Sequence, residues 1–394
     1  MLVGMLTTSF PRWPGDTAGC FVEGFARALA SLGHRVEVLC PEPVEPALDS
    51  HEPGIIVRRV PYMRPRRWSR TFYGAGVPDN LHRSPLAWLG LAPFATTLSL
   101  STLVAARRWS CTVSHWALPC ALVAAAMKVP RPHLGVFHSA DLHLLETLPM
   151  RRSLASWLLL SCDSLLFVAT AQRERFLGWL SESAATAASP RCHVQPMGID
   201  PCSGSPCDRE LLRRRLKLRR FALLSIARLV SIKGLELGIR ALTGRQDLEW
   251  IVVGSGPEQS YLQRQAALLG APVRFVGEQA GSEKHAWLHA CDAYLCTSRT
   301  LASGRSEGMP TALLEALRCG LPLITSDTGG IPSILQHEKQ ALMVPENDVT
   351  ALGTAIDRLR ASAALRATIT QAGQQLGRSL TWPTIAPTLE AWLR

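Results

Sequence analysis

Residues 221–254 read FALLSIARLVSIKGLELGIRALTGRQDLEWIVVG, and this stretch decides the fold. Two apolar runs, at 221–227 and 248–254, have the length of buried strands, and the segment between them is long enough for a helix. Parallel neighbouring strands need such a crossover connection, whereas antiparallel hairpins do not. The stretch therefore predicts a β-α-β unit within a parallel sheet.

The same alternation continues towards the C-terminus. The apolar runs VRFVG at 273–277, AYLCT at 293–297 and PLITS at 322–326 are separated by segments of about ten residues or more that suit helices. Strands that alternate with helices in this way form an open, doubly wound parallel sheet. We therefore expect one Rossmann-like α/β domain over residues 208–378.

The N-terminal half predicts a second domain of the same kind. MLVGML at 1–6 and RVEVLC at 35–40 flank a helix at about 22–32, and further apolar runs lie at 134–137 and 164–168. A chain of 394 residues exceeds one hydrophobic core, so two domains are expected. We place the first at 1–200 and a linker at 200–207, where DPCSGSPC replaces the periodic pattern.

The charge balance favours anionic partners. Lysine and arginine number 42 against 31 acidic residues, a formal net charge of +11, which suits phosphorylated substrates, anionic lipid surfaces or nucleic acid. The densest basic stretch, 58–73, is either a solvated loop or a patch for a membrane or nucleic acid. Its arginines and aromatic residues are Arg58, Arg59, Arg64, Arg66, Arg67 and Arg70 with Tyr62, Trp68, Phe72 and Tyr73.

The eleven cysteines indicate reduced thiols. The two closest pairs, Cys202/Cys207 and Cys291/Cys296, have neither CxxC spacing nor histidine partners suited to zinc. Arg12 and Asp16 would interrupt the apolar part of a secretory signal. We therefore expect a cytoplasmic protein.

The segment SPLAWLGLAPFATTLSLSTLVAA at 84–106 carries no charge and is long enough to cross a bilayer. Pro85 and Pro93, with several Ser and Thr residues, lower its hydrophobicity, and arginines flank both ends. These features favour a buried or interfacial helix over a membrane-spanning one.

Ligands of open parallel sheets bind outside the carboxyl ends of the strands, so the residues after each strand are candidates. Arg228 and Lys233 follow the first strand of the second domain, where a guanidinium and an ammonium can converge on one diphosphate. Gly254-Ser255-Gly256-Pro257-Glu258 follows the next strand. It is either a phosphate loop or a structural turn, with Pro257 at the first position of a helix.

The strongest candidate is SEGMPTALLEALRCG at 306–320, a loop that leads into a helix whose first turn holds Pro310. The amides of Gly308 to Thr311 and the helix dipole would face an anion. Glu307 would lie at the mouth and Glu315 one to two turns into the helix, where each carboxylate can accept hydrogen bonds from a vicinal diol. Alternatively, Glu315 is a surface carboxylate paired with Arg318.

The E-x7-E pattern EGMPTALLE at 307–315 resembles the retaining glycosyltransferases of family 4, which have the two-domain GT-B fold. Further matching segments cover nearly the whole chain. In the C-terminal half these are ARLVSIKG at 227–234, VGSGPE at 253–258, VRFVGE at 273–278, DTGGIPSIL at 327–335 and ALMVPENDV at 341–349. In the N-terminal half they are 8–41, SHWALPCALVAA at 114–125, FHSADLHLL at 137–145 and PMGID at 196–200.

The resemblance implies two facing Rossmann-like domains, an N-terminal acceptor domain and a C-terminal donor domain, with the last helix, 379–394, packed back on the first. It assigns the donor diphosphate to Arg228 and Lys233, the ribose to Glu315 and the transferred sugar to Glu307. The backbone of Gly308, Met309 and Pro310 would contact the donor as well.

In the first domain, the resemblance implies that Gly19 closes on the donor and that His138 lies beside the sugar, followed by Asp141. Alternatively, His138 is a histidine of the core with a purely structural role. The chain departs from the family pattern at Ala227, Ser139 and Ser333, and it has Gly19 where a glycine pair is common. These departures leave the donor-binding charges in place.

The expected activity is therefore retaining transfer of a hexosyl unit from a nucleotide diphosphate sugar, with UDP-sugars favoured over GDP-mannose. The acceptor would be a saccharide, and the segments 58–73 and 84–106 favour a lipid-linked one reached by peripheral contact with an anionic membrane. The resemblance implies no cofactor and no metal. The alternatives are a nucleotide-sugar epimerase, a dinucleotide oxidoreductase, which would want a GxGxxG motif absent from residues 1–20, and a non-catalytic nucleotide or nucleic-acid binder.

Overall fold

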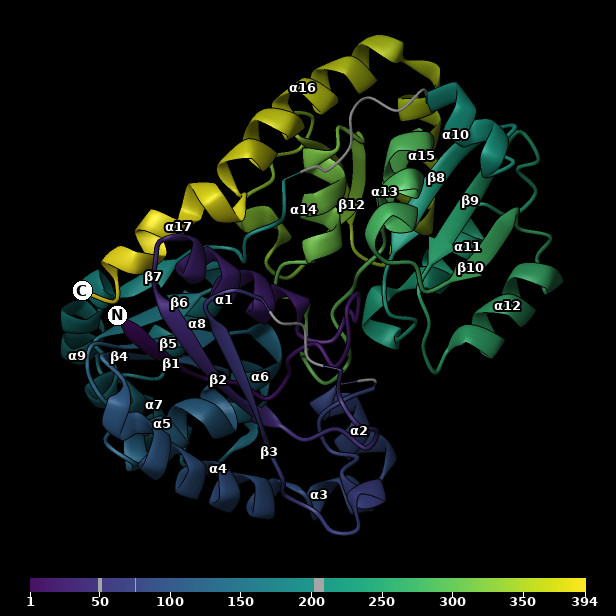
Figure 1. Cartoon of the computed structure of the whole chain (residues 1–394). Coiled ribbons are helices and arrows are strands. Elements are labelled where there is room, and N and C mark those ends of the chain that lie inside the picture. The colour runs from purple at the N-terminus through teal and green to yellow at the C-terminus, as the bar shows by residue number, and fades with distance from the viewer. Residues whose placement is uncertain (49–51, 75, 202–208) are drawn as a thin grey trace. The chain divides into compact units, whose positions relative to one another are not determined.

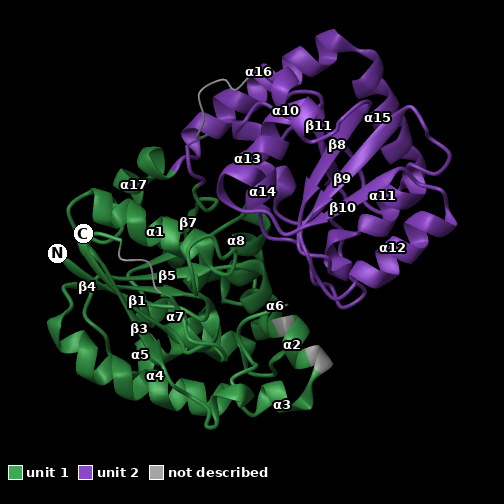
Figure 2. Cartoon of the chain, turned by 45° about the vertical axis from the view of Figure 1, so that its right-hand side comes forward, with its two compact units in different colours: residues 1–198, 382–394 green, residues 199–381 purple. Residues whose placement is uncertain are grey.

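The computed structural model describes residues 1–48, 52–74, 76–201 and 209–394 (Figure 1). The chain forms two compact units (Figure 2). Unit 1 comprises Met1–Gly198 and Trp382–Arg394, and unit 2 comprises Ile199–Thr381. Most of the predicted linker, residues 202–207, lies outside the described residues.

Unit 1 contains a seven-stranded, fully parallel sheet in the order β3-β2-β1-β4-β5-β6-β7. Its strands are β1 Leu2–Leu6, β2 Arg35–Pro41, β3 Ile55–Val60, β4 Cys111–His115, β5 His133–Phe137, β6 Ser164–Phe167 and β7 Cys192–Val194. Its helices are α1 Cys20–Ser31, α2 Val77–Arg83, α3 Pro85–Trp88, α4 Leu91–Ala105, α5 Leu122–Ala126, α6 Ser139–Thr147, α7 Arg151–Ser161, α8 Thr170–Leu177, α9 Glu182–Ala188 and α17 Trp382–Ala391.

Unit 2 contains a six-stranded parallel sheet in the order β10-β9-β8-β11-β12-β13. Its strands are β8 Phe221–Ile226, β9 Leu248–Val253, β10 Val273–Gly277, β11 Ala293–Cys296, β12 Leu323–Asp327 and β13 Ala341–Pro345. Its helices are α10 Arg209–Arg215, α11 Leu235–Ala241, α12 Gln259–Leu268, α13 Gly281–Ala290, α14 Thr311–Arg318, α15 Val349–Ala361 and α16 Ala363–Ser379.

The strand order of each sheet reverses once, between β1 and β4 in unit 1 and between β8 and β11 in unit 2. The chain winds first to one side of the starting strand and then to the other. In open sheets of this kind, ligands bind outside the carboxyl ends of the strands at the point where the order reverses. The prediction of two doubly wound Rossmann-like domains is confirmed. The topology also fixes where to inspect each unit, at the carboxyl ends of its central strands.

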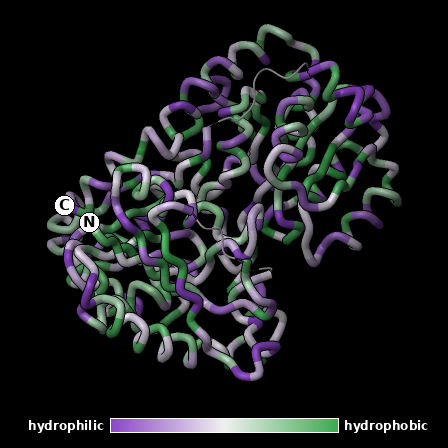
Figure 3. Tube along the Cα trace, viewed as in Figure 1, coloured by the Kyte–Doolittle hydropathy of each residue, from purple (hydrophilic) through white to green (hydrophobic). Residues whose placement is uncertain are grey.

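Most strands are buried on both faces, because helices cover both sides of each parallel sheet. The edge strands β3 and β10 are only partly buried. Apolar residues accordingly concentrate along the strands (Figure 3). In unit 2, Trp250 of β9 is fully buried; its indole Nε1 donates to Ser225 Oγ at 2.9 Å. A Cβ on Gly238 of α11 would lie 2.5 Å from the Trp250 ring, so glycine there allows the helix to pack on the sheet.

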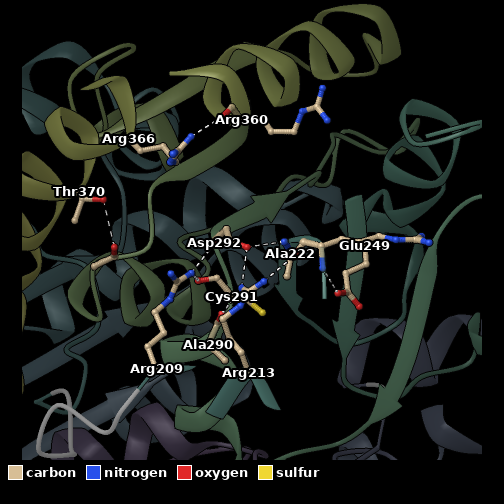
Figure 4. Close-up of polar contacts among 12 residues, drawn as sticks. Arg209, Arg213, Ala222, Glu249, Ala290, Cys291, Asp292, Arg360, Arg366 and Thr370 are labelled. Carbon is tan, nitrogen blue, oxygen red and sulfur yellow. Dashed lines mark hydrogen bonds and ion pairs between the residues drawn. The ribbon is translucent and has the colours of Figure 1, made fainter. Parts of the chain in front are cut away.

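At the amino edge of the unit 2 sheet, Asp292 joins three segments (Figure 4). Its carboxylate accepts a hydrogen bond from the Ala222 amide at 2.7 Å and pairs with Arg209 at 2.6 Å and Arg213 at 3.0 Å. Helix α10, the start of β8 and the residue before β11 are thereby held together. This ion cluster stabilises the edge opposite to the candidate site.

Helix α17 lies in unit 1, against α1. The predicted helix was 379–394, but Ser379 ends α16 and α17 begins at Trp382. The Trp382 ring packs so closely that a Cβ on Gly24 or Gly198 would lie within 2.4 Å of it. The last helix of the chain is thus built into the N-terminal unit.

The segment predicted as a buried or interfacial helix forms α3, α4 and a short 3-10 turn. Helix α4 packs one stripe, Phe94, Leu98 and Ala105, into the core and exposes apolar side chains on other faces. Pro85–Arg108 is the one stretch of helix, among the described residues, that is long and apolar enough to cross a membrane; about a third of its most apolar part is buried.

The basic stretch 58–73 divides between core and surface. Tyr62 and Phe72 are buried in an aromatic cluster with Phe94, with ring centroids 4.3 to 5.6 Å apart. Four of the arginines have partners within unit 1: Arg58 pairs with Glu37, Arg64 and Arg66 pair with Glu42, and Arg59 donates to the carbonyls of Phe10 and Pro11. These internal contacts disfavour a nucleic-acid patch that needs exposed aromatic rings and unengaged arginines.

Candidate functional site

The carboxyl ends of β8 and β11 bring two predicted site residues together. Lys233 ends a short 3-10 turn after β8, and its Nζ forms an ion pair with Glu307, which lies in the loop after β11. Ser298 Oγ donates to the same Glu307 oxygen at 3.2 Å. The Lys233 and Glu307 side chains are 15% and 16% exposed, so the pair is largely shielded but open to solvent on one side.

Two glycines allow the loops after β8, β11 and β12 to lie in close contact with one another. Gly234 has φ 57°, and a Cβ there would lie 2.2 Å from the carbonyl oxygen of Thr297. Gly329, after β12, has φ 59°, and a Cβ there would lie 2.2 Å from the Glu307 carbonyl oxygen. Both positions combine a left-handed backbone with a contact that excludes any side chain. The Lys233–Glu307 pair is therefore set by backbone packing from three loops.

The turn 254–258 is a structural support for the loop that carries Arg228. Gly254 has φ 133°, and a Cβ there would lie 2.0 Å from the carbonyl oxygen of Ala227. Leu229 N donates to the Ser255 carbonyl at 2.8 Å, which joins the two loops. Pro257 was expected at the first position of a helix, but it lies in a turn and α12 begins at Gln259. The Arg228 side chain itself is exposed at this edge.

Helix α14 follows the loop of Glu307 directly. Pro310 was expected in its first turn; in the structure Pro310 is the capping residue, with an extended backbone, and Thr311 begins the helix. Pro310 is buried, and Met309 packs against the hydrophobic core. Gly308, Met309 and Pro310 therefore form a fixed approach to the amino end of α14, where the helix dipole favours a negative charge.

Glu315 lies in the second turn of α14, as predicted. Its carboxylate pairs with Lys284 of α13, with Nζ to Oε2 at 2.8 Å and Nζ to Oε1 at 2.9 Å. The alternative pairing with Arg318 on the same helix is not what the structure records. Lys284 was not singled out in the sequence, because it lies 31 residues away on a different helix. Both side chains remain about one-fifth exposed.

Glu346, after β13, is a further residue that sequence reasoning missed. Its Oε2 accepts hydrogen bonds from Thr300 N at 2.6 Å and Thr328 Oγ1 at 2.8 Å, which ties the loops after β11 and β12 together. Burial raises the pKa of Glu346, but these hydrogen bonds outweigh it and the pKa is lowered overall. Glu346 occurs in the matched segment 341–349, which is the signal that could have found it.

The candidate residues of unit 1 lie after β1 and β5. Gly19 has φ 72° and precedes α1; a Cβ there would lie 2.5 Å from the Ser9 carbonyl oxygen, so the position requires glycine. His138 precedes α6, and its backbone N–H donates to Asp141 Oδ1 at 2.9 Å. Ala117 N donates to Asp141 Oδ2 at 2.5 Å. Asp141 therefore anchors the loops after β4 and β5 to each other.

Burial controls the protonation of this site. It lowers the pKa of His138 to about 3, so the imidazole is neutral near pH 7. Burial also raises the pKa of Asp141 to about 7, against the lowering effect of its backbone hydrogen bonds. The neighbouring His115 is fully buried, and its pKa is held well below the ordinary value by burial and then by His138. His138 is thus a neutral hydrogen-bonding group.

His138 stands among aromatic rings that the sequence reasoning did not single out. The ring centroids of Trp116 and Phe21 lie 4.9 Å and 5.1 Å from that of His138, and His115 Nδ1 lies 3.3 Å from His138 Nε2. Trp116 has φ 69°, which is strained for a residue with a bulky side chain. Residues with such strained backbone angles cluster at active and ligand-binding sites. The segment 114–125 was recognised as a whole, but its individual residues were not assigned roles.

The nine cysteines of the described residues form no disulfide. Cys202 and Cys207 lie outside the described residues, and Cys291 and Cys296 are both buried. Spacing along the chain gives no indication of a metal site. In the fold, however, Cys319 lies close to His285 and His289, which belong to a different helix.

Two family models match the chain, one on each unit. The model "Glycosyl transferase 4-like domain" matches residues 18–192, and the model "Glycosyl transferases group 1" matches residues 208–376. Together they cover most of both Rossmann-like units, and the second includes Arg228, Lys233, Glu307 and Glu315.

Curated relatives are glycosyltransferases. The chain is 30% identical over 230 residues to the amylovoran biosynthesis glycosyltransferase AmsK of Erwinia amylovora, which covers 57% of this chain and 54% of that protein. It is 29% identical over 260 residues to a GDP-mannose-dependent α-(1-6)-phosphatidylinositol monomannoside mannosyltransferase of Mycobacterium tuberculosis, which covers 63% of this chain and 66% of that protein. The alignments thus span between half and two-thirds of these relatives.

Solved structures share the fold along the whole chain. Sucrose-phosphate synthase from Thermosynechococcus elongatus superposes with a TM-score of 0.78 at 20% identity, covering 99% of this chain and 97% of that one. Anabaena HepE in complex with UDP-glucose gives a TM-score of 0.72 at 19% identity, with 99% and 98% covered. Both family models match the sequence, and the solved glycosyltransferase structures share the fold. The chain therefore belongs to the family 4-like glycosyltransferases of the GT-B fold.

Proposed function

We propose that this protein is a retaining glycosyltransferase that moves a hexosyl unit from a nucleotide diphosphate sugar to a saccharide acceptor. The observation that carries the proposal is the Lys233–Glu307 pair, which lies at the switch point of the unit 2 sheet and next to the amino end of α14. A cation, a carboxylate and a helix amino terminus at one place suit a ligand with both a diphosphate and hydroxyl groups.

The diphosphate end of the donor would take the positive groups. The leaving nucleoside diphosphate gains negative charge as the glycosidic bond breaks, so groups already fixed near that charge lower the barrier. Lys233, the exposed Arg228 and the amino end of α14 are such groups. In the free chain Lys233 is held by Glu307. Donor binding would therefore exchange this ion pair for one between Lys233 and a phosphate oxygen.

The two carboxylates would then take the two sugars of the donor. Once Lys233 turns to phosphate, Glu307 is available to accept hydrogen bonds from hydroxyls of the transferred hexose. Glu315, one to two turns along α14, would accept from the ribose hydroxyls. Lys284 would keep the Glu315 carboxylate oriented, since the two side chains are paired at 2.8 Å.

In unit 1, His138 is proposed to contact the transferred sugar as a neutral hydrogen-bonding partner. Its low pKa, set by burial, is unsuited to a general acid near pH 7 but suits donation to a sugar oxygen from one ring nitrogen. Gly19 would let the loop before α1 approach the donor without a side chain in the way. No catalytic metal takes part in this proposal.

The donor is proposed to be a UDP-sugar, with GDP-mannose as the alternative. A fold neighbour was solved with UDP-glucose, and a relative in sequence is described as GDP-mannose-dependent. The direct test is release of nucleoside diphosphate from a panel of UDP-, GDP- and ADP-sugars by the purified chain. Release from one donor that is abolished by both Arg228→Ala and Glu315→Ala is expected; no release from any donor, and no thermal shift with any, would contradict the proposal.

The acceptor is proposed to be lipid-linked, because unit 1 presents an exposed apolar surface beside basic residues. Leu100, Leu103 and Val104 of α4 are 47% to 71% exposed, and Leu86, Trp88 and Leu89 around α3 are 54% to 65% exposed. Arg107, at the end of this segment, is also exposed. Such a surface suits the interface of an anionic membrane, with apolar side chains among the acyl chains and arginine at the phosphates.

Vesicle co-sedimentation at low salt tests this docking. We expect the chain to bind vesicles containing anionic phospholipid, and the Leu103→Glu/Val104→Glu variant to bind much less. The matched control is Leu211→Glu/Leu268→Glu, which places the same two charges at positions 58% and 78% exposed in unit 2. Equal binding by both variants and the unaltered chain, or no binding at all, would exclude docking through α4.

A further inference from the structure

Helices α13 and α14 bring three metal-ligating side chains together. His285 and His289 are four residues apart on α13 and therefore lie on the same face of the helix. Cys319 directly follows the last residue of α14. One ligand atom from each of the three lies within 4.8 Å of the others, and all three residues are partly buried.

We propose that His285, His289 and Cys319 form a binding site for Zn²⁺. Two imidazole nitrogens and one thiolate are ligands that zinc favours, at about 2.0 to 2.1 Å for nitrogen and 2.3 Å for sulfur. Ligand atoms of a tetrahedral zinc ion are then about 3.5 Å apart. The observed spacing, up to 4.8 Å, exceeds this by at most about 1.3 Å, a difference that side-chain rotation of partly exposed residues can close. Three protein ligands leave the fourth position to water.

The surrounding charges permit a cation at this site. The adjacent residue on α13 is the cationic Lys284, but its ammonium group is paired with Glu315 at 2.8 Å. This pair offsets its charge. The thiolate of Cys319 would contribute one negative charge to the ion itself. Lys284 therefore opposes a divalent cation less than an unpaired lysine would. Arg318, the residue before Cys319, is a second cation near the site, and the thiolate charge acts against it.

Zinc at this site would join the same two helices that the Lys284–Glu315 pair joins. Cys319 lies four residues after Glu315 on α14, and His285 directly follows Lys284 on α13. The ion would thus fasten α13 to the end of α14 about one helical turn from the proposed ribose-binding carboxylate. Since binding occurs only in the folded state, zinc should raise the thermal stability of the protein.

Cobalt substitution tests the site independently of transferase activity. Co²⁺ is titrated into the full chain carrying Cys202→Ser and Cys207→Ser, so that these two thiols cannot compete, and the near-ultraviolet thiolate-to-cobalt absorption is followed. We expect uptake of one ion per chain, displacement of cobalt by Zn²⁺, and a higher Tm with Zn²⁺. Cys319→Ser should abolish the absorption, and His285→Ala or His289→Ala should weaken binding at least tenfold.

Two matched variants separate this cluster from adventitious binding. Cys20→Ser removes an exposed thiol of unit 1, and His337→Ala removes an exposed histidine of unit 2; neither should change uptake. Circular dichroism of the Cys319→Ser variant confirms that it folds. Absence of the cobalt absorption in the parent chain, or its persistence after Cys319→Ser, would overturn the proposal.

Discussion

The two sheets share the same order of their first six strands, but the loops at the carboxyl ends of their central strands differ in charge. In unit 2 the edge carries two charge pairs, Lys233–Glu307 and Lys284–Glu315, each partly open to solvent. In unit 1 the corresponding edge carries His138, whose burial lowers its pKa to about 3, packed against aromatic rings. The loops after β8 and β11 thus form a charged edge, and the loops after β4 and β5 form a neutral edge. The ion pairs at the carboxyl end of the unit 1 sheet, such as Arg12–Asp16, lie in other loops.

Under the proposed function, the difference between the two edges corresponds to two kinds of ligand. Paired charges that are only partly buried can exchange partners, which a diphosphate ligand requires. Neutral rings and a neutral imidazole offer apolar contact and single hydrogen bonds, which suit an uncharged sugar. The predictions below test each edge in turn.

The largest effect is expected at the charged edge. Lys233→Met keeps most of the side-chain length but removes the ammonium, so transfer should fall by about 10²–10³-fold because developing phosphate charge loses its fixed partner. Steady-state assay of nucleoside diphosphate release measures this. The control, Lys339→Met, removes an exposed lysine of the same unit and should leave transfer unchanged. Equal effects of the two changes would contradict a specific role for Lys233.

Three buried histidines of unit 1 predict acid sensitivity of folding; His115 and His138 lie at the neutral edge, and His133 begins β5. Burial lowers the pKa of His133 to about 4 and of His138 to about 3, and holds that of His115 well below its ordinary value. The unfolded chain binds these protons near pH 6.5, so stability is lost as pH falls through that value towards 4. Asp141, with its pKa raised to about 7, has the opposite effect on stability. As the pH falls below 7, the folded state takes up a proton on Asp141 that the unfolded chain does not yet bind.

The three histidines outweigh Asp141, so the free energy of unfolding should fall by about 3 kcal/mol between pH 7 and pH 5. Urea denaturation at several pH values, followed by circular dichroism, measures the change. His138→Phe should reduce the pH dependence by about one proton, whereas His337→Phe, an exposed position, should not. A chain that grows more stable on acidification would rule out neutral buried histidines.

A smaller effect is expected at the second charge pair. Glu315→Gln keeps one acceptor oxygen and the side-chain volume but removes the charge, so the KM for the donor should rise by about tenfold, with a smaller change in kcat. Glu283→Gln is the matched control, since Glu283 is exposed on the neighbouring helix and pairs with Arg215. If both glutamines raised KM alike, Glu315 would have no special contact with the donor.

Much of the fold could be predicted from the sequence, and the exceptions have a common cause. Strands β8 to β12 were predicted within one or two residues, because each is an apolar run bounded by glycine, proline or charge. Strands β3, β4 and β7 were not, since they are short or carry polar and charged residues. Strand β13 is a five-residue apolar run that was noted only as a matching segment and not predicted as a strand. In β3, Arg58 and Arg59 break the apolar run, and their partners Glu37 and the Phe10 carbonyl come from elsewhere in unit 1.

The candidate site could be predicted in its residue types but not in its pairings. Lys233 and Glu307 are 74 residues apart, and only the switch point of the sheet brings them together. Lys284 could not be assigned to Glu315 from helical spacing, which suggested Arg318 instead. Trp116 gave no signal, because its significance lies in a strained backbone and in rings contributed by other loops.

The most direct test of the account is the affinity for the free nucleoside diphosphate of the preferred donor, measured by calorimetry for Lys233→Met and Glu307→Gln. If Lys233 serves the diphosphate and Glu307 the sugar, Lys233→Met weakens binding. Glu307→Gln leaves the affinity for the nucleoside diphosphate unchanged or raises it, because the substitution releases Lys233 and removes a negative charge. The rate of sugar transfer nevertheless falls in this variant. Equal weakening by both changes would contradict the division of roles between the two residues.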